Sequence, residues 1–186
     1  MPALIRTLAK LTAYVMVFFS CAVAAVEQDI VINIEKSGEA FIVETRFDVQ
    51  VPLRTAWDVL TDFDHMTGIL GNLSSSRIVR RDGNTLYVAQ EGVARFGIFS
   101  YAFASEREIR LEPMKRILAK QLTGNAKRFE SELQLTSEGT ATQVHYRAEV
   151  VPDSGFARTF GGSFIKHEVG EQFTAMTAEM MRRKSP

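Results

Sequence analysis

Apolar and polar residues alternate with a period of two through most of the chain, from about residue 30 to residue 151. The clearest run extends from Phe41 to Val51. Successive side chains of a strand point to opposite faces of a sheet, so this pattern predicts antiparallel strands with one buried face. The strands are predicted over residues 30–35, 41–51, 76–82, 85–92, 99–111, 115–123, 127–136 and 141–151.

Three segments change to a helical period. A short helix is predicted over 53–63, where the preceding Pro52 suits a helix start because it lacks an N–H that the first turn leaves unpaired. A second short helix is predicted near 65–72. A long helix is predicted from about residue 155 to Arg183, with an apolar stripe that consists of Ile165, Val169, Phe173, Met176 and Met180.

Only one long helix is available to cover the apolar face of this sheet. A strongly curved sheet wrapped around that helix buries both, and it leaves a cavity wherever side chains do not fill the space between them. We therefore predict an α+β fold in which a curved antiparallel sheet wraps around the C-terminal helix, with two short helices after the first two strands. The alternative is that the aromatic residues of the inner faces simply fill a core.

Residues 1–25 have the features of a signal peptide. Arg6 and Lys10 give a positive start, an apolar run follows, and Ala22-Val23-Ala24-Ala25 supplies the small residues that a signal peptidase needs. Cleavage would leave Val26 as the first residue of a periplasmic or secreted protein. Two alternatives are an uncleaved anchor, although the apolar run is shorter than the ~20 residues that span a bilayer, and lipidation at Cys21.

The composition excludes several classes of function. The 22 basic and 22 acidic residues balance, which argues against a dedicated nucleic-acid-binding protein. The single cysteine cannot form an internal disulfide or a cysteine-rich zinc site. We expect no bound metal, no cofactor and no catalytic residue in the sense of a known motif.

Several segments carry a family resemblance. They are Val51-Pro52 followed by Ala56-Trp57-Asp58-Val59-Leu60-Thr61-Asp62-Phe63, then Asn72 to Val79, Gln90-Glu91-Gly92, and Leu122-Thr123-Gly124 followed by Lys127-Arg128-Phe129-Glu130. The chain resembles the START-like, birch-pollen-allergen-like (SRPBCC) superfamily with its helix-grip fold, and within it the polyketide cyclase/dehydrase and coenzyme-Q-binding type of domain. The resemblance covers about residues 40–183. The length of 186 residues predicts one domain, which would extend over 26–186 once the leader is removed. Two departures are the extra strand at 30–35 and a glycine pair, Gly161-Gly162, where the family often has a proline-rich loop.

The resemblance implies a cavity that holds a hydrophobic ligand under the C-terminal helix. Arg107 shares a strand face with aromatic residues; if it points inward it needs a partner, such as a ligand headgroup, and otherwise it reaches solvent. The candidate ligand-binding residues are Phe47, Trp57, Phe99, Tyr101, Phe103, Arg107, Phe129, Tyr146, Phe160, Phe164 and Phe173.

The predicted function is exported binding or transport of a hydrophobic small molecule such as a lipid, a quinone or a polyketide-like compound. One alternative is a cyclase or dehydratase in which Tyr101, Tyr146 or His65 moves protons. The default interpretation of His65 is that it forms a turn between two helices with Asp62 and Asp64. A second alternative is a protein-interaction module. Transient contact with a membrane, through Lys127-Arg128, is a further expectation, and the oligomeric state is left open.

Overall fold

The computed structural model describes residues 30–153 and 161–184, so the predicted signal peptide and Phe160 lie outside the described residues. The elements follow in the predicted order. They are β1 (Ile32–Ser37), β2 (Ala40–Val49), α1 (Leu53–Leu60), the 3-10 helix η1 (Phe63–Gly68), β3 (Leu73–Asp82), β4 (Thr85–Phe96), β5 (Phe99–Glu112), β6 (Arg116–Gly124), β7 (Ala126–Glu138), β8 (Ala141–Pro152) and α3 (Gly161–Lys184).

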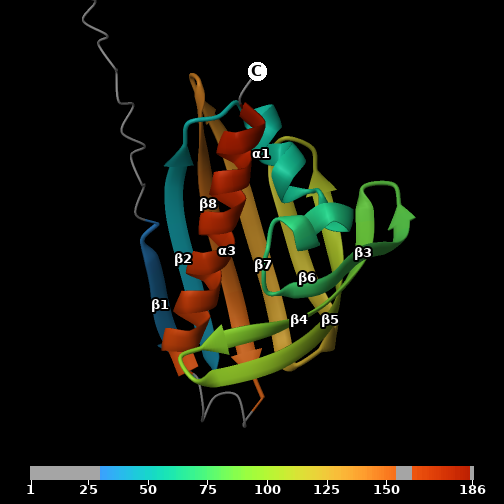
Figure 1. Cartoon of the computed structure of the whole chain (residues 1–186), viewed down its shortest axis with the longest axis vertical. Coiled ribbons are helices and arrows are strands. Elements are labelled where there is room, and N and C mark those ends of the chain that lie inside the picture. Colours follow the sequence, from blue (N-terminus) through green and yellow to red (C-terminus); the bar gives the residue numbers. More distant parts are fainter. Residues whose placement is uncertain (1–29, 154–160, 185–186) are drawn as a thin grey trace, which may run out of the picture.

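All eight strands form one antiparallel sheet in the order β1-β2-β8-β7-β6-β5-β4-β3. Chain neighbours pair as hairpins, except that β2 pairs with β8 and brings the two ends of the strand sequence together. The sheet curves around α3, which lies across its concave face, and α1 and η1 lie beside the C-terminal half of that helix (Figure 1). The predicted curved sheet, long helix and two intervening short helices are confirmed.

The core follows from the period-two pattern. In β2 the buried side chains alternate with more exposed ones, and the apolar members of this buried face include Val43, Phe47 and Val49. They meet the buried face of α3, which carries Phe173 and Met180. The sheet and α3 therefore bury each other, which is the physical reason for the fold.

Beyond shifts of about three residues at the end of α1 and the start of β3, two segments differ from their predicted form. The second short helix is a 3-10 helix over residues 63–68 rather than a helix near 65–72. Here the chain has to turn into β3, and side chains hold the turn: the Asp64 carboxylate accepts a hydrogen bond from the Ile78 amide at 2.7 Å. β4 also continues to Phe96, because its last residues pair with β5 as far as Phe99. The longer β4–β5 hairpin ends at an apolar tip where Ile98 is 93% exposed.

An ionic cluster fixes the C-terminal end of α3. The Glu179 carboxylate accepts hydrogen bonds from Arg182 and Arg183, each at 2.6 Å. Arg183 also donates to Asp62 at 2.8 Å, which ties α3 to the connection between α1 and η1. These hydrogen bonds lower the pKa of Glu179 from its ordinary value of 4.5 to about 2, against a smaller opposing effect of burial.

This cluster predicts a loss of stability in acid. Because the pKa of Glu179 is lowered on folding, its contribution is complete above pH 4.5 and is lost as the pH falls from 4.5 towards 2. Arg182 is 71% exposed, so solvent screening reduces the contribution to about 1 kcal/mol. Urea titrations at neutral pH and near pH 3 measure it. The Glu179→Gln variant should lose about 1 kcal/mol at neutral pH and show a smaller acid effect than the wild type; an unchanged acid effect would contradict the assignment.

No helix within residues 30–153 and 161–184 has both the length and the hydrophobicity to span a membrane.

Candidate functional site

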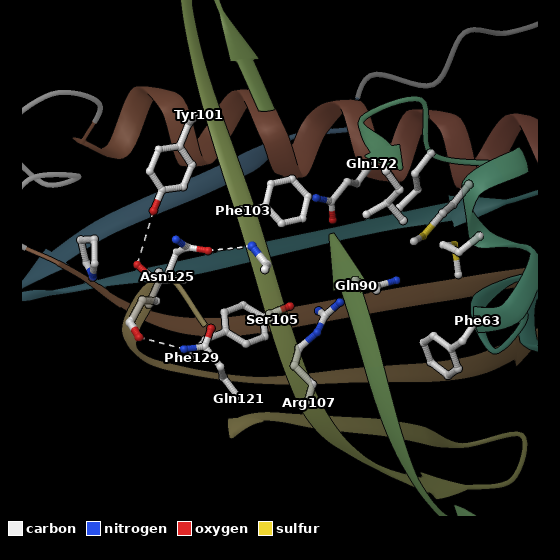
Figure 2. A pocket seen from close by; sticks show the side chains of 18 of the residues that line it. Phe63, Gln90, Tyr101, Phe103, Ser105, Arg107, Gln121, Asn125, Phe129 and Gln172 are labelled. Carbon is white, nitrogen blue, oxygen red and sulfur yellow. Dashed lines mark hydrogen bonds between the residues drawn. The ribbon is translucent and has the colours of Figure 1, made fainter. Parts of the chain in front are cut away.

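A cavity of about 290 Å³ lies between the sheet and the helices that cover it. Strands β4 to β8 form one wall, and α1, η1, the start of β3 and α3 form the other (Figure 2). Its lining residues are Leu60, Phe63, Met66, Leu70, Leu73, Gln90, Tyr101, Phe103, Ala104, Ser105, Arg107, Gln121, Asn125, Ala126, Phe129, Val150, Pro152, Gln172 and Met176.

Most of the wall is apolar. The buried side chains of α1 and η1 face the sheet, and three of them, Leu60, Phe63 and Met66, reach the cavity. Phe103 and Phe129 come from the sheet side, on β5 and β7. An apolar ligand would be stabilised here by removing these surfaces from water.

A chain of hydrogen bonds connects the sheet to η1 at one side of the cavity. The Gln90 amide on β4 donates to the Ser76 hydroxyl at 3.0 Å, and that hydroxyl donates to the Phe63 carbonyl at 2.6 Å. Both side chains are buried, so the chain satisfies polar groups that would otherwise be unpaired. It also fixes the Gln90 side chain at the cavity wall.

The turn between β6 and β7 closes another side of the cavity. Asn125 accepts a hydrogen bond from the Ala104 amide at 2.7 Å, and the Gln121 amide donates to the Ala126 carbonyl at 2.8 Å. Gly124 has a φ of 153°, and a Cβ atom there would lie 2.9 Å from the Gln121 side chain. Glycine therefore allows Gln121 to reach across its own turn.

Arg107 is the charged residue of the cavity lining. It pairs across the strands with Val88 on β4 and Gln121 on β6, and Figure 2 shows its side chain between Gln90 and Phe129. The register between β5 and β6 shifts beside Arg107, which leaves Leu122 as an extra residue in β6. Such bulges redirect side chains, and this one places both Arg107 and Gln121 on the cavity side.

The Nε atom of the Arg107 guanidinium is buried. This atom has no hydrogen-bond partner among the described residues. Burial lowers the pKa of Arg107, and only a weaker interaction with Tyr146 opposes this. An arginine nevertheless keeps its proton in a protein, so the cavity wall carries a positive charge.

At the side of the cavity near α3, Asn72 links the loop before β3 to that helix. Its amide donates to the Glu168 carboxylate at 3.0 Å. Burial raises the pKa of Glu168, although the Asn72 hydrogen bond and the charge of His167 oppose the shift. Val93 of β4 donates its N–H to the Asn72 carbonyl at 2.9 Å, so the loop is held from both sides.

Residues 49–177 match a family described as polyketide cyclase / dehydrase and lipid transport, and this match spans the cavity from α1 to α3. The chain belongs to this family. No curated protein sequence matches the chain closely enough to be named as a relative.

Solved structures show the same fold in proteins of low sequence identity. The Zhui aromatase/cyclase from Streptomyces sp. R1128 is 17% identical, with a TM-score of 0.69 over 77% of this chain and 95% of its own. A START superfamily protein from Mycobacterium smegmatis is 12% identical, with a TM-score of 0.60 over 77% and 96%. Norcoclaurine synthase from Thalictrum flavum, solved with dopamine and hydroxybenzaldehyde, is 11% identical, with a TM-score of 0.58 over 79% and 90%. The predicted helix-grip fold and superfamily are therefore confirmed.

Within this family fold, the structure brings four of the residues predicted to bind ligand into the cavity lining. They are Tyr101, Phe103, Arg107 and Phe129. The first three follow one another at every second or fourth position of β5, and Phe129 lies on β7 with its ring centroid 5.8 Å from the guanidinium carbon of Arg107. Their contact with a ligand stays a prediction.

Four other candidates pack in the core beside the cavity. Phe47 and Tyr146 hold their rings against Phe173, with ring centroids 5.3 Å and 5.1 Å apart. Trp57 is buried on α1 in the same cluster. These residues face inward as the alternation predicts, but they fill the space between the sheet and α3 and are not in the lining of this cavity. Their contact with a ligand also stays a prediction.

The remaining two described candidates lie towards the N-terminal end of α3. Phe164 is buried, with its ring centroid 6.0 Å from that of Phe96 and 6.4 Å from that of Tyr101. Phe99 is 50% exposed at the end of the β4–β5 hairpin and is not in the cavity lining. The strand pattern placed it on the inner face, but the hairpin extends past the core at that point.

Several residues of the cavity lining were not among the predicted ligand-binding residues. Leu60 and Phe63 were on the apolar face of the helix predicted over 53–63, but a helical period does not distinguish a cavity wall from a filled core. The other apolar residues near η1 have no periodicity that would mark them, and the polar lining residues are amides that resemble ordinary surface residues. None of these lining residues was a candidate for ligand binding. They are Leu60, Phe63, Met66, Leu70, Leu73, Gln90, Gln121, Asn125, Gln172 and Met176. Met176 was in the apolar stripe of the last helix, so its inward orientation had a signal in the sequence.

Of the three residues considered for acid–base chemistry, Tyr101 lines the cavity, whereas Tyr146 and His65 lie outside its lining. His65 is 80% exposed in its side chain and contacts Asp62 at 2.7 Å. His145 contacts Glu44 at 2.9 Å on the outer face of the sheet. Lys127 and Arg128 form ion pairs with Glu39 and Glu149 respectively, so these two cations already have partners.

Proposed function

We propose that this protein is an exported binding protein that carries a small hydrophobic molecule in the cavity under α3. The observation that carries the proposal is the apolar-walled space of about 290 Å³ between the sheet and α3. Ligand pockets are typically of ~300–1,000 Å³, mostly apolar, with a few polar groups that set the orientation of the ligand. The wall of this cavity is likewise mostly apolar, and its volume lies at the lower end of that range.

The volume limits the ligand. At roughly 30 Å³ per water molecule, the cavity has room for about ten waters. A compound with one or two rings fits within it, whereas a lipid with two acyl chains would extend far outside. Among the lipid, quinone and polyketide-like classes, we therefore favour the small ring compounds.

The ionisation of the lining supports binding over acid–base catalysis. Among the described lining residues the titratable groups are Tyr101 and Arg107. Burial, together with the negative charge of Asp153, raises the pKa of Tyr101, while its hydrogen bond to the Asn125 carbonyl opposes this. A general base works best with a pKa near the working pH, and these two groups keep their protons there.

Export is supported by residues 1–25, where a positive start, an apolar run and Ala22-Val23-Ala24-Ala25 follow in the order of a signal peptide. Membrane contact stays a prediction. The apolar tip of the β4–β5 hairpin, with Ile98 93% exposed, is the part of the described surface that favours it.

Mass spectrometry of the protein purified from the exported fraction tests both parts of the proposal. We expect an intact mass that begins at Val26, and under native conditions an additional mass that solvent extraction releases as a small ring compound. A protein that retains Met1 would contradict cleavage of the leader. A protein that carries no compound and also binds no neutral apolar probe would contradict the carrier function.

A further inference from the structure

The Arg107 side chain has a buried donor that no described residue satisfies. This side chain points towards the cavity from β5 (Figure 2), and its Nε is buried. No residue in 30–153 or 161–184 forms a hydrogen bond or ion pair with this side chain. A buried charge without a partner is among the most unfavourable arrangements in a protein. Natural cavities retain such a group when something that binds there completes it.

The described residues around Arg107 provide no counter-ion. The described lining residues include no aspartate or glutamate. Glu106 and Glu108 flank Arg107 but alternate to the other face of β5, where Glu108 pairs with Arg110 at 2.9 Å. Tyr146 is close enough to interact with Arg107, but burial raises the pKa of this phenol, with an opposing hydrogen bond to Ser131, so it is neutral.

The neighbouring groups define the shape of the missing partner. Gln121 lies opposite Arg107 across the β5–β6 pair, and Ser105 is two residues away on the same face of β5. The Phe129 ring lies 5.8 Å from the guanidinium carbon. An arginine presents its N–H groups as a planar fork that matches the two oxygens of a carboxylate, and apolar walls surround the remainder of the cavity.

We infer that the ligand is a small apolar carboxylic acid, bound as its carboxylate to Arg107 with its ring or branched body against the apolar wall. This inference rests on the proposed carrier function and narrows the class of ligand. The carboxylate supplies the counter-ion that the described lining residues do not provide. The single negative charge of the ligand balances the single positive charge of the guanidinium. The volume of the cavity limits the body of the ligand to one or two rings.

Two probes of nearly the same shape test whether a negative charge on the ligand strengthens binding. Naphthoic acid and its neutral amide, naphthamide, differ only in the group that would meet Arg107. By isothermal titration at neutral pH, we expect the wild type to bind the acid roughly 10- to 100-fold more tightly than the amide, the range for one hydrogen-bonded charge. The Arg107→Met variant keeps a similar length without the charge. It should bind both probes with the affinity that the wild type has for the amide.

Arg110→Met is the matched control, because Arg110 lies on the same strand, faces away from the cavity and is 68% exposed. It should keep the wild-type preference for the acid. A second measurement checks that Arg107→Met folds: without ligand its melting temperature should equal or exceed that of the wild type, since an unpaired buried charge has been removed.

The outcomes separate the two proposals. Equal affinity of the wild type for acid and amide overturns the carboxylate inference and leaves the carrier function standing. Retention of the acid preference in Arg107→Met also overturns it. Failure of the wild type to bind either probe overturns both.

Discussion

Replacement of Gly92 by alanine should destabilise the domain by about 3 kcal/mol, the upper part of the usual range for overpacking. A Cβ atom at this position on β4 would overlap the carbonyl oxygen of Asn72, and it would lie 2.8 Å from Cζ of Phe103 and 3.0 Å from the carbonyl carbon of Asn72. The first obstacle is backbone, which cannot rotate away as a side chain can. The loop that carries Asn72 has to move, and its hydrogen bond from Val93 is lost.

Urea denaturation of the Gly92→Ala variant measures this effect. The matched control is Gly71→Ala in the same loop, where a Cβ atom would meet nothing within 4 Å. We expect its stability to stay within about 0.5 kcal/mol of the wild type. Equal stability of Gly92→Ala and the wild type would show that the loop does not approach β4 closely in solution. The added Cβ atom would also displace the Phe103 ring, which lines the cavity. The Gly92→Ala variant should therefore also bind ligand more weakly.

Enlarging Met176 to tryptophan should block the cavity. Met176 is on α3 and lines the cavity opposite the sheet, so a larger ring at this position occupies the volume that a ligand would use. A loss of only about 60 Å² of buried apolar area, at ~25 cal/mol per Å², weakens binding by about 1.5 kcal/mol, which is roughly tenfold. We expect at least this loss in affinity for naphthamide by isothermal titration.

Met181→Trp provides the control for this variant. Met181 is on the same helix but is 44% exposed, so the same substitution there leaves the cavity unchanged. It should bind naphthamide as the wild type does. If Met176→Trp folds, as judged by circular dichroism, and still binds naphthamide with wild-type affinity, the ligand does not occupy the space under α3.

The two kinds of binding variant report different properties of one cavity. Met176→Trp removes volume and should weaken acid and amide alike, whereas Arg107→Met removes charge and should weaken only the acid. A ligand that is sensitive to the first variant but not to the second is held by apolar contact alone. One that is sensitive to both has the carboxylate that the unpaired guanidinium favours.

Local sequence was sufficient for the elements of the fold. The alternation in β2 and β8 results directly from the two faces of a strand, and Pro52 together with the apolar face that includes Trp57 determines α1. A sheet of this size with one long helix to cover it has few ways to bury its apolar face. The overall architecture could therefore be predicted without any knowledge of contacts.

The cavity was decided by tertiary structure. Period-two alternation shows that Phe47 and Phe103 both face inward, but not how far α3 lies from the sheet at each point. Phe173 reaches the ring of Phe47 and fills that space, whereas Phe103 borders a space that no side chain fills.

The sequence also could not show whether the Arg107 side chain has a partner in the folded protein. Its inward orientation was one of two open interpretations, and the bulge at Leu122 and the pairing with Gln121 place it on the cavity side. Whether a buried charge is neutralised depends on residues brought together from several strands and helices. Local alternation therefore predicts the faces of the regular strands, because successive side chains of a strand point to opposite sides. Long-range packing decides the orientation of residues beside a bulge, such as Arg107, and whether they meet a partner in the fold or are left for a ligand.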